Sequence, residues 1–238
     1  MGKNLILIIL SVIAFSACDD DNLPNIRPAA ANKFVDERDG RVYEWIRIGN
    51  LEWMTSNLKY GTPYFEREYG GAFMDDYGNT QEIASNFIDF DMQADFKTNG
   101  NLYMWEELEE MVPEGWRVPT DEDWKNLEMA LGMSQKEADK EGWRGDQEAT
   151  LLRQGKDGLG MGLQLSGCAW QSGAYGFDII LTNIDECGYF WADTEVKDNG
   201  LQVPTVYFRK IMATQSSVYR GTTPLNILMR VRCVRDAK

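Results

Sequence analysis

The sequence predicts a single domain of the α+β class, because strand signals come first, helix signals follow, and strand signals then return. Apolar and polar residues alternate with period two from Phe34 to Ile48. Helix caps and helical spacing cluster between residues 103 and 142, whereas glycines and aromatic residues dominate after Gly155. We expect residues 34–238 to form one domain, long enough to bury a core rich in Trp, Tyr and Phe.

The first strands are expected to form a hairpin. Its second strand has two faces, which are Val42, Glu44, Ile46 and Ile48 on one side and Tyr43, Trp45 and Arg47 on the other. Asp39-Gly40 is a dipeptide favoured in two-residue hairpin turns. A further turn at Gly49-Asn50 leads into a short strand over residues 51–54.

Three helices are predicted in the middle of the chain. The first covers residues 103–111, where apolar residues recur at i, i+3 and i+6. Thr120 begins the second, because its hydroxyl can cap a helix and Asp123 follows three residues later, as in a capping box. The apolar face of this helix consists of Trp124, Leu127 and Leu131. Ser134 with Glu137 repeats the cap for a short third helix.

Less regular chain surrounds these helices. Residues 60–101 are rich in Gly, Asp and aromatic residues without a clear period, which predicts a long, ordered loop region. The aspartates of this region lack the spacing of a calcium-binding loop, and we expect no metal site. Four later strands are predicted, at residues 163–167, 189–192, 203–212 and 228–234.

The first eighteen residues are typical of a bacterial lipoprotein signal. Lys3 precedes an apolar run from Leu5 to Phe15, which is shorter than the roughly 20 residues that a membrane-spanning helix needs. We expect residues 1–17 to be removed as a signal peptide and Cys18 to carry a lipid that attaches the domain to a membrane. The alternative is an ordinary signal peptide in which Cys18 is incidental.

Residues 18–33 are expected to link this lipid to the domain. They contain three aspartates directly after Cys18 and then a stretch rich in Asn and Ala, with two prolines and no apolar period. Such a composition is typical of a flexible tether.

Composition excludes several classes of function. The chain has no histidine, so a Ser-His-Asp triad, a histidine-ligated zinc and a histidine general base are all excluded. Its net charge of −14 argues against binding to nucleic acid or to anionic lipid headgroups, which require a basic surface. We therefore expect no catalytic residue, no cofactor and no nucleic-acid partner.

Three cysteines lie within the domain, at positions 168, 187 and 233, and no Cys-x-x-Cys pair occurs. Cys168 and Cys187 flank a stretch that can form a hairpin, so a disulfide between them is one interpretation. Free buried thiols are the second interpretation, and a redox or copper site is the third.

Several motifs occur along the chain in an order shared with a known family. They are Asp39-Gly40 with Tyr43, Trp53-Met54, Leu102-Tyr103 with Trp105, Gly115–Trp124, Gly142–Gly145, Gly188–Trp191 and Arg230–Val234. Together they resemble the Fibrobacter succinogenes major paralogous domain, which occurs in surface proteins of Bacteroidetes and Fibrobacter. That family often has a cysteine before its Pro-x-Gly-Trp segment. Here the position is Val112, so the resemblance implies that Cys233 lacks its usual partner.

A second resemblance concerns the fold. The segment from Arg117 to Trp124 and the closing residues 231–234 are similar to segments of formylglycine-generating and related sulfatase-modifying proteins. Both resemblances imply a C-type lectin-like fold, with two or three helices packed on small antiparallel sheets and with long loop regions. They also imply that the two chain ends meet in one sheet. The acidic run after Cys18 resembles the surface-export signal of Bacteroidetes lipoproteins, which implies an outer-membrane, surface-exposed location.

Aromatic and arginine side chains of the second half are the candidate ligand contacts, because aromatic faces stack on sugar rings and Tyr and Arg anchor protein interfaces. The candidates are Trp170, Tyr175, Phe177, Tyr207, Arg209, Tyr219 and Arg220. Core packing is the alternative for each of them.

The sequence thus predicts a non-enzymatic, surface-anchored, lectin-like module that binds a glycan or a protein outside the cell. One alternative is a structural component of a cell-surface assembly. The other is an oxidase similar to formylglycine-generating enzymes, which needs reactive thiols.

Overall fold

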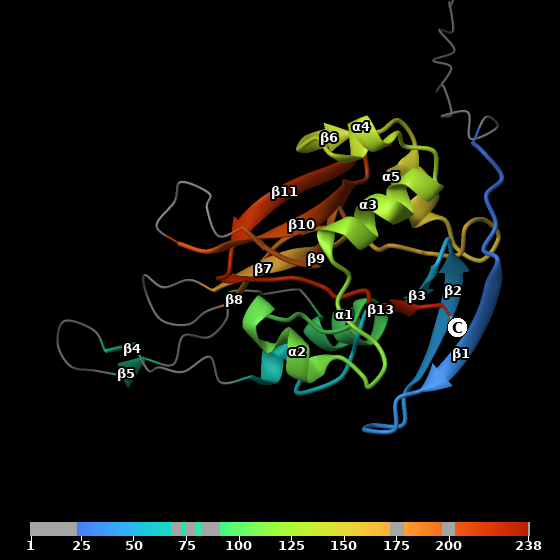
Figure 1. The fold of residues 1–238 in the computed structure, drawn as a ribbon. Helices are drawn as coiled ribbons and strands as arrows, with labels where there is room; N and C mark the ends of the chain where they lie inside the picture. The colour runs from blue at the N-terminus through green and yellow to red at the C-terminus, as the bar shows by residue number, and fades with distance from the viewer. Residues whose placement is uncertain are drawn as a thin grey trace, which may run out of the picture.

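The two ends of the described chain meet in one sheet. The computed structural model describes residues 23–67, 73–74, 80–81, 91–171, 179–196 and 203–237. The strands of this first sheet run in the order β1, β2, β3, β13, and each neighbouring pair is antiparallel (Figure 1). They are β1 (Ala30–Val35), β2 (Val42–Ile48), β3 (Leu51–Met54) and β13 (Val234–Asp236).

A larger sheet contains β12, β7, β9, β10, β11 and β6 in that order, with β8 paired to β7. Its strands are β6 (Gly142–Arg144), β7 (Ser166–Gln171), β8 (Ile179–Ile184), β9 (Cys187–Val196), β10 (Thr205–Met212), β11 (Val218–Pro224) and β12 (Ile227–Leu228). All neighbouring pairs are antiparallel except β7 and β9, which are parallel at Gly167 and Gly188. A small ribbon joins β4 (Phe73–Met74) to β5 (Thr80–Gln81).

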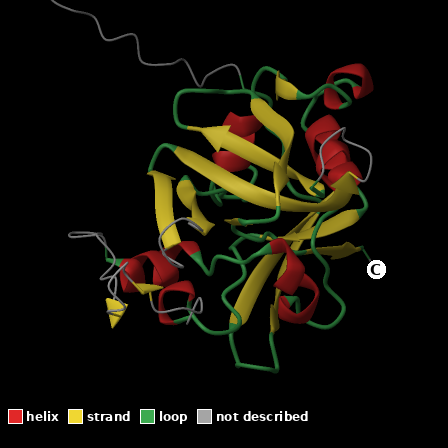
Figure 2. Cartoon of the chain, turned by 90° about the vertical axis from the view of Figure 1, so that its left-hand side faces the viewer, coloured by secondary structure: helices red, strands yellow, loops and turns green. Residues whose placement is uncertain are grey.

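Short helices surround the strands (Figure 2). They are α1 (Met92–Asn99), α2 (Leu108–Met111), α3 (Asp121–Ala130), α4 (Gln135–Ala138) and α5 (Glu148–Arg153), with 3₁₀ turns at Tyr64–Glu66 and Trp105–Glu107. The prediction of an α+β fold is confirmed. Among the described residues, no helix is long and apolar enough to span a membrane.

Helix α3 begins at the predicted cap. The Asp123 amide donates to the Thr120 hydroxyl at 3.1 Å, and the Thr120 amide donates to the Asp123 carboxylate at 2.7 Å. Two orphan amides of the first turn are therefore satisfied reciprocally, as in a capping box. The predicted apolar face is buried, and the ring of Trp124 lies 5.0 Å from Trp53 and 6.0 Å from Phe190. The predicted third helix is α4, where Ser134 caps the helix.

Other elements differ from the prediction. The first hairpin turns over residues 36–41 instead of two residues, and the Asp36 amide donates to the Arg41 carbonyl at 2.8 Å. Residues 103–111 form a 3₁₀ turn followed by α2. Helix α1 lies in the expected loop region, where the Asp91 carboxylate accepts from the Ala94 amide at 2.9 Å and caps it. The prediction also lacks α5, β6, β8 and β11, which are short or follow no clear helical or strand period.

Much of the expected tether lies against the domain. Leu23 and Ile26 pack against the core cluster that contains Trp124. The Arg27 guanidinium donates to the carbonyl of Gly158 at 2.8 Å, and β1 begins at residue 30. The two apolar side chains explain the difference, because they bury surface that a solvated tether would expose.

The predicted strand at residues 228–234 is interrupted by two buried arginines. Arg230 forms an ion pair with Asp95 of α1 at 2.6 Å. The Arg232 guanidinium donates to carbonyl groups, including that of Met161 at 3.1 Å, and burial lowers the pKa of Arg232 to about 9. The chain therefore forms β12, an interior segment and β13 in place of one strand.

Two carboxylates of α3 bind three arginines of the larger sheet. Asp121 accepts hydrogen bonds from Arg209 Nη1 and from Arg220 Nη2, both at 2.7 Å. Glu128 accepts from Arg209 Nε at 2.8 Å and from Arg144 Nη2 at 2.5 Å. All five side chains are buried. We call these five residues the buried ion network.

The network fixes α3 against β6, β10 and β11. Burial alone would raise the pKa of Asp121, but hydrogen bonds and charges from Arg220 and Arg209 hold it below its ordinary value. A buried ion becomes costly when its partner is removed, because the remaining charge has neither water nor a counter-ion. The position of α3 on the sheet therefore depends on these carboxylates.

Replacing Glu128 by glutamine should destabilise the domain by about 3–5 kcal/mol, because two buried guanidinium groups lose their shared anion. The measurement is equilibrium urea unfolding followed by tryptophan fluorescence. E137Q is the matched control, since Glu137 is solvent-facing and pairs with Lys140 three residues later in the sequence. Equal unfolding midpoints for E128Q and E137Q would contradict the role given to the network.

Candidate ligand-binding face

The structure separates the seven predicted ligand contacts. Tyr175 and Phe177 lie outside the described residues. Trp170 lies in β7, where its backbone pairs with Ile227 of β12. The remaining four lie on β10 and β11, and they are Tyr207, Arg209, Tyr219 and Arg220.

Arg209 and Arg220 face α3. They are 1% and 7% exposed, and both bind Asp121. A ligand cannot reach guanidinium groups that are enclosed between a sheet and a helix. Their predicted role as ligand contacts is therefore corrected, and they belong to the core.

Tyr207 lies on the same side of β10 as Arg209, because the two residues are two positions apart on one strand. Its ring lies 4.2 Å from the guanidinium carbon of Arg220, and its hydroxyl donates to Glu141 at 3.1 Å. These contacts use both the ring and the hydroxyl within the protein. Tyr207 is thus half-buried support for the network.

Tyr219 lies on the opposite side of the sheet, in a line that crosses four strands. Residues directly opposite one another in neighbouring strands share one face of a sheet. Trp143 of β6 is opposite Tyr219 of β11, and Tyr219 is opposite Lys210 of β10. Lys210 is in turn opposite Tyr189 of β9, and Phe208 lies two positions before Lys210 on the same face. We call Trp143, Tyr189, Phe208, Lys210 and Tyr219 the aromatic row.

The rings of the aromatic row contact one another in sequence across the sheet. The ring centroids of Trp143 and Tyr219 lie 5.4 Å apart, those of Tyr219 and Phe208 lie 5.8 Å apart, and those of Phe208 and Tyr189 lie 6.2 Å apart. Aromatic pairs at such distances stabilise each other beyond the area they bury. Trp143 is 38% exposed. Among the residues that the structure describes, the other exposed large hydrophobic side chains are valines. Tyr189 belongs to the buried core and Phe208 and Tyr219 are half-buried, so the row offers a rigid aromatic surface that is exposed at its Trp143 end.

Lys210 occupies the middle of this row. Its ammonium nitrogen lies 5.6 Å from the centroid of the Trp143 ring and 5.5 Å from that of Tyr189. Both distances fall within the range of cation–π attraction. Within the part of the chain that the structure describes, Lys210 forms no ion pair with a carboxylate. A cation without a counter-ion thus lies beside exposed aromatic surface.

A hollow of about 690 Å³ lies elsewhere, between the first hairpin and residues 155–162. Its apolar lining includes Trp45 and Leu159. The cations at its edge are Arg27, Lys33 and Lys156, of which Arg27 donates to backbone carbonyls and Lys156 pairs with Glu44 at 2.8 Å. The lining of this hollow includes none of the predicted ligand contacts that the structure describes.

A family model named the Fibrobacter succinogenes major domain matches residues 46–235 of this chain. The chain belongs to this family. It has no significant match among curated proteins or among solved structures. Sequence similarity therefore identifies the family of this chain.

In this Fibrobacter succinogenes major domain, the match begins within β2 and ends within β13. It includes all four strands of the aromatic row. Two motifs that carry the family resemblance also contain row residues, namely Gly142–Gly145 with Trp143 and Gly188–Trp191 with Tyr189. These motifs are the sequence signal for those two residues. Phe208 and Lys210 are assigned to the row only by the register of β10 with β9 and β11.

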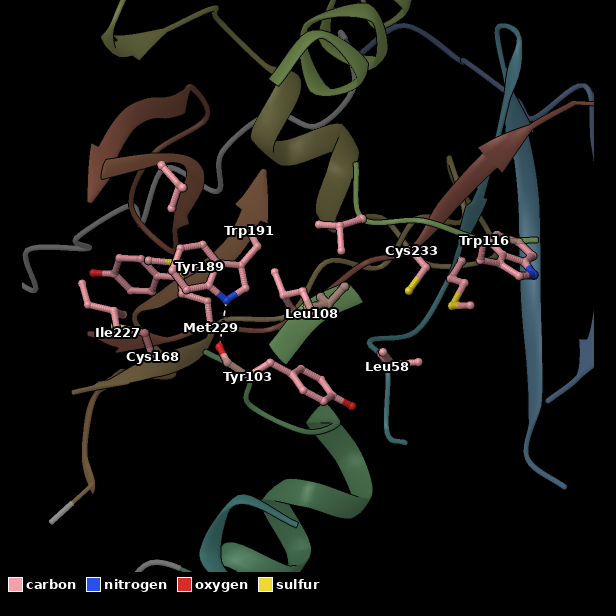
Figure 3. Close-up of a cluster of buried hydrophobic side chains, with 14 of the residues drawn as sticks. Leu58, Tyr103, Leu108, Trp116, Cys168, Tyr189, Trp191, Ile227, Met229 and Cys233 are labelled. Atoms are coloured by element: carbon pink, nitrogen blue, oxygen red, sulfur yellow. Dashed lines mark hydrogen bonds between the residues drawn. The ribbon is translucent and has the colours of Figure 1, made fainter. Parts of the chain in front are cut away.

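The cysteines of the domain are free thiols in buried positions. Cys168 and Cys233 lie at different ends of one core cluster, with Cys168 near Tyr189 (Figure 3). Val112 packs against the same cluster, so an apolar contact is present where the family often has a cysteine. Burial raises the pKa of Cys168 to about 12 and also raises the pKa of Cys233. Such thiols are poor nucleophiles, because the thiolate is the reactive form.

The predicted disulfide between Cys168 and Cys187 is absent from this structure. Gly167 and Gly188 are register partners in parallel strands, so the two cysteines lie two positions out of register. Strand spacing and residue rise then place their Cα atoms about 8 Å apart, beyond the span of a disulfide.

Among the described residues, no cluster of three or more His, Cys, Asp or Glu side chains could hold a metal ion.

Thiol labelling tests this arrangement. In the chain from residue 18 onward with C18S, denaturation without reductant should allow N-ethylmaleimide to label Cys168, Cys187 and Cys233, as measured by intact-protein mass spectrometry. The native chain should label far more slowly, because the thiols are buried and their protonated form dominates. A sample reduced before denaturation is the control. Labelling of Cys233 alone in the unreduced sample would show that the disulfide forms.

Proposed function

We propose that this chain is a surface-anchored lipoprotein whose domain binds an extracellular glycan or protein without catalysing a reaction. The aromatic row is the observation that carries the proposal. Rigid aromatic side chains supply large contact area at a small cost in conformational entropy. The exposed Trp143 ring and the half-buried Tyr219 ring beside it can stack on a sugar ring or anchor a protein partner.

We also propose that the domain has a C-type lectin-like fold, distantly similar to sulfatase-modifying proteins. Support comes from the sheet β1-β2-β3-β13, in which the two ends of the described chain meet. All five residues of the row lie in the second half of the chain, so the proposed recognition face agrees with the region that the resemblance implies.

The proposed anchor is a lipid on Cys18, on the outer membrane of a member of the Bacteroidetes, with the domain exposed at the cell surface. Four residues separate Cys18 from Leu23, where packing against the domain begins. The five steps along the chain from Cys18 to Leu23 span at most about 18 Å. The domain would therefore stand close to the lipid surface, and its ligand would be bound near the membrane.

The buried cysteines of the domain argue against the oxidase alternative. That chemistry needs accessible thiolates, whereas burial raises the pKa of Cys168 and Cys233. The chain also has no histidine to act as a base.

Substituting Trp143 tests the proposed function. A glycan array together with a pull-down from a mixture of surface proteins should identify a ligand for the chain carrying C18S. W143A should weaken that binding by about tenfold or more, because Trp143 is the exposed anchor of the row. V42A is the matched control, since Val42 is another exposed apolar residue and lies at the start of β2 in the first hairpin. Unchanged urea midpoints for both variants show that each is folded.

Two results would overturn the proposal. One is the absence of any partner at micromolar concentration in both assays. The other is a ligand whose affinity is equally insensitive to W143A and V42A, because that ligand would bind elsewhere. A pull-down that recovers only partners of an intact surface complex would instead favour the structural alternative.

A further inference from the structure

Lys210 gives the aromatic row a chemical preference, and the inference drawn from it rests on the proposed function of that row. Its cross-strand partners are both aromatic, Tyr219 on one side and Tyr189 on the other. The side chain is half-buried, with its ammonium group near the Trp143 and Tyr189 rings. The neighbouring side chains thus hold the charge at the centre of the row.

The environment of this charge contrasts with that of the other half-buried lysines of the described chain. Lys125 pairs with Glu122 at 2.6 Å, and the Lys59 ammonium group donates to the Lys97 carbonyl. The chain has 38 acidic residues and a net charge of −14, so carboxylates are plentiful. Yet within the described chain none of them pairs with Lys210, and its contacts are with aromatic rings. An external anion can occupy the position that a protein carboxylate leaves open.

A neutral ligand fits this position poorly. Stacking on the row would take water from the ammonium group and supply no counter-ion, which is unfavourable. An anionic group beside Lys210 removes this cost, and the nearby rings lower the local polarity and so strengthen the attraction.

The geometry of the row also favours a sugar chain over an acidic peptide. The accessible part of the row consists of the exposed Trp143 ring and the half-buried Tyr219 and Phe208 rings, whose centroids follow one another at 5.4 and 5.8 Å. Aromatic rings of this kind can stack on the rings of a sugar chain. An acidic peptide side chain would satisfy Lys210 but would leave most of the rings without a flat partner.

We propose that the aromatic row binds an acidic glycan, with Lys210 pairing with a carboxylate or sulfate group of one sugar while the Trp143 and Tyr219 rings stack on adjacent sugars. The ammonium group is a compact point charge, so it accepts either anion. The specificity therefore resides in charge together with ring stacking.

Isothermal titration of the chain from residue 18 onward with C18S tests this proposal. The probes are oligogalacturonate, its carboxyl-reduced neutral counterpart, a sulfated oligosaccharide and poly-glutamate. K210M retains the aliphatic stem and removes the charge, whereas K210R retains the charge. K136M is the matched control for net charge, because Lys136 is an exposed lysine on α4.

We expect binding of at least one of the two acidic glycans, and the carboxylated and sulfated probes distinguish which anion is preferred. K210M should weaken it by about tenfold, K210R should retain most of it, and K136M should leave it unchanged. W143A should weaken the same ligand, which links both residues to one site.

Four results would overturn the inference. Equal affinity for oligogalacturonate and its reduced counterpart would show that binding does not depend on the charge of the glycan. Equal affinity of K210M and K136M for the acidic glycan would show that binding does not depend on the charge of Lys210. Lys210-dependent binding of poly-glutamate alone would assign the row to an acidic peptide. If a neutral glycan binds in a Trp143-dependent manner and no acidic glycan does, the proposed function stands and the inference fails.

Discussion

The buried ion network is the constraint on which the rest of the domain depends. Each of its arginines is next in sequence to a residue of the aromatic row, as Arg144 follows Trp143, Arg209 precedes Lys210 and Arg220 follows Tyr219. Adjacent residues of a strand point to opposite faces of the sheet. When Asp121 and Glu128 hold the arginines beneath α3, the rings and the lysine must face the other way. A slip of one residue would exchange the two sets and leave the buried carboxylates of Asp121 and Glu128 without their arginines.

This arrangement divides the larger sheet into a structural face and a recognition face. The structural face carries charge that is fully paired and therefore inert toward ligands. The other face carries aromatic rings and Lys210, which has no ion pair among the residues that the structure describes and lies beside the exposed Trp143. Helix α3 and the aromatic row are thus two consequences of the same strand register.

Local signals in the sequence predicted local structure well. The cap at Thr120 and the apolar spacing of Trp124, Leu127 and Leu131 specify α3, because capping and helical periodicity act over a few residues. Arg209 was predicted as a ligand contact, because its partner Asp121 lies 88 residues away and nothing local reveals the pair. Ile26 was assigned to a tether because one apolar residue shows no period.

Part of the site could be predicted and part could not. Tyr219 was identified from residue type alone, and the family motifs already contained Trp143 and Tyr189. Lys210 is placed beside them only by the pairing of β10 with β9 and β11, and this register cannot be predicted from a single sequence.

The most direct test of the account is ¹⁹F NMR of the chain labelled with 5-fluorotryptophan. The Trp143 resonance is assigned from W143F, and the labelled chain is titrated with oligogalacturonate. The account predicts that the Trp143 resonance shifts while those of the buried Trp53 and Trp124 stay in place. Saturable binding that leaves the Trp143 resonance unmoved would contradict it.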